Sequence, residues 1–89
     1  APAGALNKWL KVISAATKPA DVRALVGQVP AELMSPVWLR LVALEVAAAG
    51  SVEVLGVVAG QFDPAWPEEV REAAYGMVED RRLALEAAG

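Results

Sequence analysis

The side chains of this chain that could do acid–base or metal chemistry are carboxylates, and they gather in its last quarter. The group consists of Glu68, Glu69, Glu72, Glu79, Asp80 and Glu86. Glycoside hydrolysis needs two carboxyl groups that face each other across a cleft, and a calcium loop needs oxygen ligands at a characteristic spacing. Acids strung along one helix meet neither requirement. We interpret them as the solvated side of that helix.

Nucleophilic catalysis lacks its usual participants. The chain contains no histidine and no cysteine, which removes thiol nucleophiles, Cys/His zinc sites and the commonest general base. Ser14, Ser35 and Ser51 therefore have no histidine to activate them. The glycines match neither the dinucleotide-binding pattern nor the Walker loop. We expect a protein that is not an enzyme and that holds no cofactor and no metal.

The distribution of charge argues against a nucleic-acid partner. Eight basic and eleven acidic residues leave a net charge of −3, whereas duplex-binding proteins rely on a concentrated basic face. The bases are dispersed, and the adjacent pair Arg81-Arg82 directly follows Glu79-Asp80. Helix-turn-helix binding would return as a candidate only if residues 8, 11, 18 and 23 converge on one exposed face.

Hydrophobic residues make up 56% of the chain, which raises the question of a membrane. A helix needs about 20 predominantly apolar residues to span a bilayer, and the longest run without a charge, Val54 to Phe62, has nine. The start of the chain lacks the basic and apolar segments of a signal peptide. We expect a soluble protein with no membrane partner, and cytoplasmic by default, although no residue pattern identifies a compartment.

Prolines and glycines divide the chain into segments of helical length. The pattern predicts an all-α, five-helix domain with helices over about 5–16, 19–27, 35–49, 52–61 and 68–85, plus one turn over 31–34. Thr17, Ser35 and Ser51 are expected to cap the second, third and fourth of these helices.

Two of these segments have distinctive compositions. The segment 35–49 carries only two charges, Arg40 and Glu45, and a helix that is apolar on nearly every side is expected to be the central one. The valines of 52–61 would also suit a strand. We favour a helix there, because no second strand exists to satisfy the backbone of the first.

A short pattern recurs along the chain at intervals of about 30 residues. Trp38-Leu39-Arg40 resembles Trp9-Leu10-Lys11 at an offset of 29, and Glu69-Val70-Arg71 is a weaker third copy at an offset of 31. Val26-Gly27-Gln28 similarly resembles Ala59-Gly60-Gln61. Units of this length with two antiparallel helices are typical of α-solenoids, although a compact five-helix bundle would use the same features.

The stretch from Val54 to Leu85 resembles a HEAT-type helical repeat. The resemblance rests on the turn Asp63-Pro64, the helix start Val70-Arg71 and the alanines Ala73-Ala74. It departs from the family pattern by the extra Trp66-Pro67-Glu68 in the turn. The resemblance implies helices packed in antiparallel pairs, and it implies that Arg71 and its counterpart Arg40 bind an acid or backbone carbonyls near a turn.

The candidate interaction residues are Trp66, Arg40, Arg71, Trp38 and Tyr75. Trp66 lies in a proline-flanked turn, where it either covers the core or anchors a partner, and Trp38 is expected in the core or between repeats. We expect a single domain, a fragment of a larger protein with linker-like ends at 1–4 and 86–89. It would serve as a protein–protein interaction module, scaffold or adaptor, or self-associate. The alternative is an accessory domain in which Trp38, Trp66 and the arginines bind a small anionic or aromatic ligand.

Overall fold

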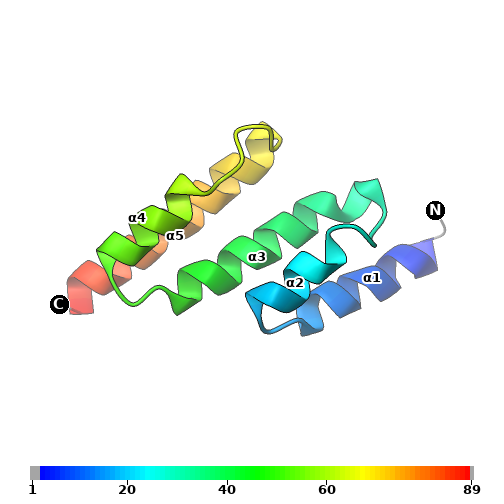
Figure 1. Cartoon of the computed structure of the whole chain (residues 1–89), viewed down its shortest axis with the longest axis horizontal. Helices are drawn as coiled ribbons and strands as arrows, with labels where there is room; N and C mark the ends of the chain where they lie inside the picture. The colour runs from blue at the N-terminus through cyan, green and yellow to red at the C-terminus, as the bar shows by residue number, and fades with distance from the viewer. Residues whose placement is uncertain (1–2, 89) are drawn as a thin grey trace.

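The computed structural model describes residues 3–88 as five α-helices and one 3-10 turn (Figure 1). The helices are α1 (Ala3–Ala15), α2 (Pro19–Leu25), α3 (Met34–Ala48), α4 (Val52–Gly60) and α5 (Glu68–Ala88), and the turn η1 (Ala31–Leu33) leads into α3. No strand occurs among the described residues. The prediction of an all-α, five-helix domain is confirmed.

Local sequence explains where several helices begin. Pro19 is the first residue of α2, where its fixed φ suits a helix and its missing N–H costs nothing. Ser51 caps α4, because its hydroxyl accepts a hydrogen bond from the Val54 N–H at 3.2 Å. Glu68 and Glu69 occupy the first turn of α5, where negative charge favours the helix dipole.

Two of the predicted caps are wrong. The N-cap residue of α2 is Lys18, whose backbone is extended, and Thr17 therefore lies one residue too early. Helix α3 begins at Met34, whose N–H already bonds to the carbonyl of Ala31 in η1. Ser35 is consequently the second residue of the helix, while Leu33 holds the N-cap position and makes no side-chain cap bond.

The valine-rich segment that could have been a strand is the helix α4. Leu55 and Val58 are buried on its inner side, whereas Val54 and Val57 are exposed on its outer side. Because the members of each pair are one helical turn apart, the apolar side chains divide between two faces of a helix.

Helix α3 is the centre of the fold and contacts every other element. Figure 1 shows α1 and α5 on opposite sides of α3, with the short helix α2 alongside α1 and α3 and the short helix α4 alongside α5. The principal dimensions are 47 × 25 × 18 Å. The expectation that the segment from Ser35 to Gly50 forms the central helix is therefore confirmed.

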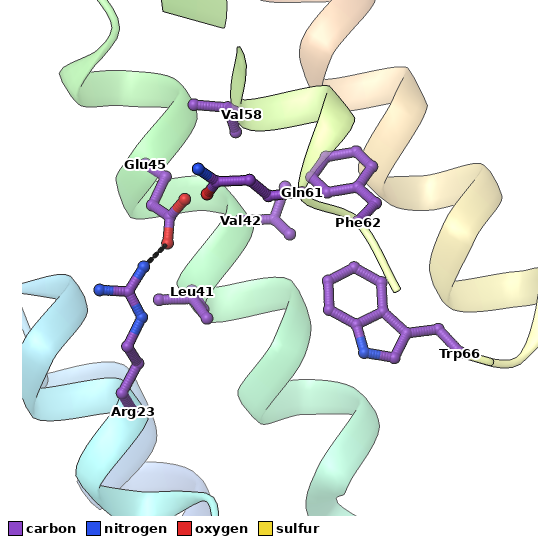
Figure 2. Close-up of a pocket in the computed structure, with 8 residues that line it drawn as sticks. All are labelled: Arg23, Leu41, Val42, Glu45, Val58, Gln61, Phe62 and Trp66. Atoms are coloured by element: carbon purple, nitrogen blue, oxygen red, sulfur yellow. Dashed lines mark hydrogen bonds and ion pairs between the residues drawn. The ribbon is translucent and has the colours of Figure 1, made fainter. Parts of the chain in front are cut away.

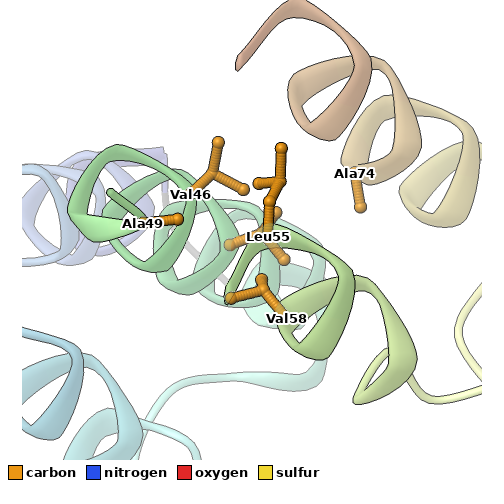
Figure 3. Packing of buried hydrophobic residues seen from close by; sticks show 6 residues of the cluster. Val46, Ala49, Leu55, Val58 and Ala74 are labelled. Atoms are coloured by element: carbon orange, nitrogen blue, oxygen red, sulfur yellow. The ribbon is translucent and has the colours of Figure 1, made fainter. Parts of the chain in front are cut away.

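Two separate clusters of buried side chains lie on opposite faces of α3. The N-terminal core lies between α1, α2 and α3 and contains Ile13, Val22, Leu33 and Val37. The C-terminal core lies between α3, α4 and α5 and contains Val42, Val46, Ala49, Leu55, Val58 and Ala74. Figure 3 shows side chains of α3, α4 and α5 converging on this second core.

Two pairs of corresponding helix boundaries are separated by the same number of residues, 33. Helices α1 and α3 end at Ala15 and Ala48, and helices α2 and α4 begin at Pro19 and Val52. We call this shared difference of 33 residues the boundary offset. The Gly-Gln pairs of the sequence pattern, Gly27-Gln28 and Gly60-Gln61, follow the same offset. The tryptophan pattern does not, because its offsets of 29 and 31 are shorter.

The two tryptophans that the sequence pattern pairs have different surroundings. Trp9 packs against the N-terminal core, whereas Trp38 stacks on the ring of Trp66. By the boundary offset, Trp9 corresponds to Val42, which belongs to the C-terminal core. The likeness between the two tryptophan segments thus does not correspond to equivalent places in the fold.

The described parts of the two linker-like ends are helical. Residues 3–4 belong to α1 and residues 86–88 belong to α5, while residues 1–2 and 89 lie outside the described part of the chain. Within residues 3–88, no helix combines the length and the apolar character that crossing a bilayer requires.

Candidate functional site

A cleft of about 170 Å³ opens between α2 and α4, above the middle of α3. Figure 2 shows its lining: Arg23, Leu41, Val42, Glu45, Val58, Gln61, Phe62 and Trp66. Since the two cores lie on different faces of α3, the short helices do not close over the stretch between them. We call this feature the α2–α4 cleft.

Apolar side chains form the floor and one wall of the α2–α4 cleft. Leu41 and Val42 of α3 contribute the floor, and Phe62 and Trp66 project from the connection between α4 and α5 (Figure 2). That connection is braced by Asp63, whose carboxylate accepts a hydrogen bond from the Ala65 N–H at 2.8 Å. The aspartate of the Asp-Pro turn thus holds the loop that carries Trp66.

Four of the five aromatic residues form one continuous cluster beside the cleft. The rings of Trp38 and Trp66 stack with centroids 5.7 Å apart. Phe62 bridges Trp66 and Tyr75, with centroid distances of 5.6 and 5.1 Å. Trp66 is half-buried against the C-terminal core, so it covers the core and still presents part of its ring to the cleft. Trp38, Trp66 and Tyr75, three of the predicted interaction residues, are therefore brought together.

The opposite edge of the cleft is polar. Arg23 of α2 donates to Glu45 of α3 over 2.7 Å, and the Glu45 side chain is only 17% exposed. Gln61 lies near this pair on the α4 side. The ion pair joins α2 to α3 along this edge, and it leaves the edge with hydrogen-bonding groups but no net charge.

The two predicted arginines bind backbone carbonyls instead of lining the cleft. Arg40 donates to the carbonyls of Ser14 and Ala16 at the end of α1, over 2.9 to 3.2 Å. Arg71 donates to the carbonyl of Trp66 over 3.1 Å. Neither arginine binds an acid, and the nearby acids are engaged elsewhere, Glu45 with Arg23 and Asp63 with the Ala65 N–H. The arginines hold helix ends and the loop that carries Trp66.

Arg81 performs the same task as Arg40 and was missed from the sequence. Its guanidinium donates twice to the carbonyl of Ala49, at the end of α3, over 3.0 and 3.3 Å. The sequence did contain a sign of this role, because helical spacing places Arg81 on the inward stripe of α5 with Ala74, Met77 and Val78. A charged residue on an apolar stripe needs a buried partner.

A second hollow, of about 370 Å³, lies between α3 and α5 and is shallower and more open than the cleft. Its lining is Ala43, Val46, Ala47, Met77, Asp80 and Arg81. Arg81 is held there by the Ala49 carbonyl, and no aromatic ring takes part. The α2–α4 cleft therefore offers the better-defined contact surface.

The basic residues named for nucleic-acid binding do not all remain free. Arg23 is paired with Glu45, whereas Lys8, Lys11 and Lys18 are exposed. In the described part of the chain, no group of three acidic side chains is arranged to hold a metal ion.

Comparisons of the chain with protein-family models, with curated proteins and with solved structures found no match.

Proposed function

We propose that this domain is a non-catalytic protein–protein interaction module that holds one large apolar side chain of a partner protein in the α2–α4 cleft. The observation that carries the proposal is a small cleft with an aliphatic floor, an aromatic wall of Phe62 and Trp66, and a polar edge of Arg23, Glu45 and Gln61. Buried aromatic and arginine residues are the side chains that most often dominate binding energy at protein interfaces.

The volume of the cleft supports one side chain rather than a whole ligand. A cavity of about 150 Å³ is large enough for benzene, and the α2–α4 cleft holds about 170 Å³. Sites for drug-sized molecules measure roughly 300–1,000 Å³. The size therefore suits one Leu-, Phe- or Met-like group.

Charge also favours a protein segment over an anionic ligand. Among the described residues, the only cation that lines the cleft is Arg23, and Glu45 already neutralises it. Arg40 and Arg71 do not reach the cleft. The ion pair and Gln61 can instead donate to and accept from the backbone of a bound segment. The resemblance of Val54 to Leu85 to a HEAT-type repeat also supports a protein partner, since α-solenoids bind along extended concave surfaces.

The experiment that tests the proposal is selection from a random peptide library with the whole chain as bait. We expect the selected peptides to share one large apolar residue, and we expect their binding to shift amide NMR signals of α3 and the α4–α5 connection. Burial of such a side chain is worth about 1.5–3 kcal/mol, so replacing it by alanine should weaken binding roughly 10- to 100-fold.

A matched pair of variants locates the site. Gln61→Trp places a large ring in the cleft and should abolish peptide binding. Gln28→Trp makes the same change at the exposed glutamine of the first Gly-Gln pair, outside the cleft lining, and should bind normally. Peptides that lack an apolar anchor, or that bind both variants equally, would refute the proposal.

A further inference from the structure

The charges of this chain are segregated along the fold. Residues 1–31 contain four bases and one acid, a net charge of +3, while residues 32–89 contain four bases and ten acids, a net charge of −6. Helix α1 carries Lys8 and Lys11 and has no acidic residue, and α5 carries most of the acids. Because α1 and α5 flank α3 on opposite sides (Figure 1), the molecule has a basic end and an acidic end.

Helix α3 shows how a long helix of this fold packs on both sides. Its first face carries Val37, Leu41 and Leu44, which pack in the N-terminal core against α1 and α2. Its second face carries Val42 and Val46 together with Ala49 at the helix end, all three buried in the C-terminal core beneath α4 and α5. The two faces are the places where the preceding and following helices dock.

The boundary offset identifies the matching face on α1. The first face of α3 corresponds on α1 to Gly4, Lys8 and Lys11, all of which are exposed. The stripe of α1 that packs on α3, by contrast, is Leu6, Trp9 and Ile13. The outer face of α1 therefore carries a glycine and two lysines, whereas the corresponding face of α3 carries three apolar side chains.

The outer face of α5, turned away from the buried Val70 and Ala74, carries Tyr75, Glu79 and Arg82. Tyr75 is 52% exposed, and Leu83 beside this face is 53% exposed. Arg82 forms ion pairs with Glu79 and, at 2.8 Å, with Glu86. One base against these two acids leaves the face with a net negative charge, and Glu72, one turn from Tyr75, adds to it. The outer face of α5 thus joins the exposed Leu83, and the part of the Tyr75 ring that is not packed on Phe62, to negative charge.

We propose that copies of this chain associate head to tail, with the basic outer face of α1 of one copy packed on the acidic outer face of α5 of the next. In this arrangement Lys8 and Lys11 meet Glu72 and Glu79, and the ring of Tyr75 packs where Gly4 leaves room. None of the ion pairs within residues 3–88 uses Lys8 or Lys11, so both are available to a second copy. The contact joins two different surfaces, and such a contact can continue from copy to copy.

The test is sedimentation velocity of the whole chain over a range of concentrations, at low and at high salt. We expect the average mass to rise steadily with concentration at low salt. High salt should weaken the association roughly tenfold, because exposed ion pairs are screened. The proposed cleft plays no part in this contact, and Gln61→Trp should therefore associate normally whatever the outcome of peptide selection.

Charge-swap variants separate this contact from loss of structure. Lys8→Glu with Lys11→Glu, and Glu72→Lys with Glu79→Lys, should each be monomeric while keeping normal helix content by circular dichroism. The fourfold variant restores opposite charges at the two faces and keeps the net charge of the natural chain, so it should associate again. A monomer under all conditions, a closed dimer that does not grow, or association that ignores both salt and these variants would overturn the proposal.

Discussion

Arg40 lets the structure be tested through a single side chain. Its Nε and one Nη donate to the Ala16 carbonyl over 3.1 and 2.9 Å, and the same Nη donates to the Ser14 carbonyl over 3.2 Å. These carbonyls lie at the end of α1, where helical backbone has no partner of its own. Replacing Arg40 by methionine keeps most of the packing volume and removes all three bonds.

The expected cost follows from the geometry. A hydrogen bond from a charged group contributes about 1.5–3 kcal/mol, and solvent reduces this for the half-buried Arg40. The two bonds to Ala16 act on one oxygen and count as one strong contact, and the exposed bond to Ser14 adds a few tenths of a kcal/mol at most by the same principle. We therefore expect Arg40→Met to lower the free energy of unfolding by about 2 kcal/mol, and to lower Tm by roughly 8–16 °C for a chain of this length.

The assay is urea unfolding followed by circular dichroism, with two comparison variants. Arg40→Lys keeps the charge but lacks the planar fork that reaches two carbonyls, and it should fall between the natural chain and Arg40→Met. Arg82→Met removes an arginine whose bonds lie on the surface of α5, and it should leave the midpoint almost unchanged. If Arg40→Met costs no more than Arg82→Met, carbonyl binding by Arg40 does not stabilise the contact between α1 and α3.

Three further predictions concern the core, a cap and a carboxyl group. Leu55 is 1% exposed in the C-terminal core, and Leu55→Ala should cost about 2–5 kcal/mol in urea unfolding through the cavity it leaves. Ser51→Ala should cost roughly 1 kcal/mol, because it removes the one side-chain cap of α4. The hydrogen bond from Arg82 holds the pKa of the Glu79 carboxyl below its ordinary value. This lowered pKa favours the folded state at pH values above the ordinary glutamate pKa, and the contribution disappears as the pH falls through the lowered value; Arg82→Met should raise the Glu79 pKa in an NMR titration.

Each of these has a control in the same chain. Val57→Ala changes an exposed side chain of the same helix as Leu55 and should stay within about 0.5 kcal/mol. Thr17→Ala should cost little, because Thr17 caps no helix. A cost at Thr17 equal to that at Ser51 would contradict the assignment of caps. A Glu79 pKa that does not respond to Arg82→Met would show that the pair does not persist in solution.

Arg40 and Arg81 show why a guanidinium recurs in this fold. Each reaches from one long helix to the carbonyl oxygens at the end of the preceding long helix, α1 for Arg40 and α3 for Arg81. Apolar contacts alone allow neighbouring helices to slide, whereas a forked donor fixes one helix end at one position on the next. These two residues therefore tie α3 to the end of α1 and α5 to the end of α3.

The sequence alone determined the number and approximate limits of the helices, because those depend on nearby residues. Proline at the first turn of α2, Ser51 before α4 and the glutamates at the start of α5 act within a few residues of their own position. Missing histidine and cysteine likewise excluded whole classes of chemistry without any knowledge of the fold. The two wrong cap predictions, at Thr17 and Ser35, were also small errors, because the N-caps lie only one and two residues away.

Only the tertiary structure decided which side chains meet. The sequence paired Trp9 with Trp38, but packing places these two rings in different surroundings. Arg40 and Arg71, which it also paired, do share a role, because each donates to backbone carbonyls beside a turn. Arg23, Glu45 and Gln61 come from three different segments and meet at the cleft because α2 and α4 both pack against α3. The basic face of α1 and the acidic face of α5 likewise lie at opposite ends of the molecule only because α3 packs between these two helices. Local preferences end within a turn or two of helix, while contacts between distant parts of the sequence depend on the shape and packing of the entire chain.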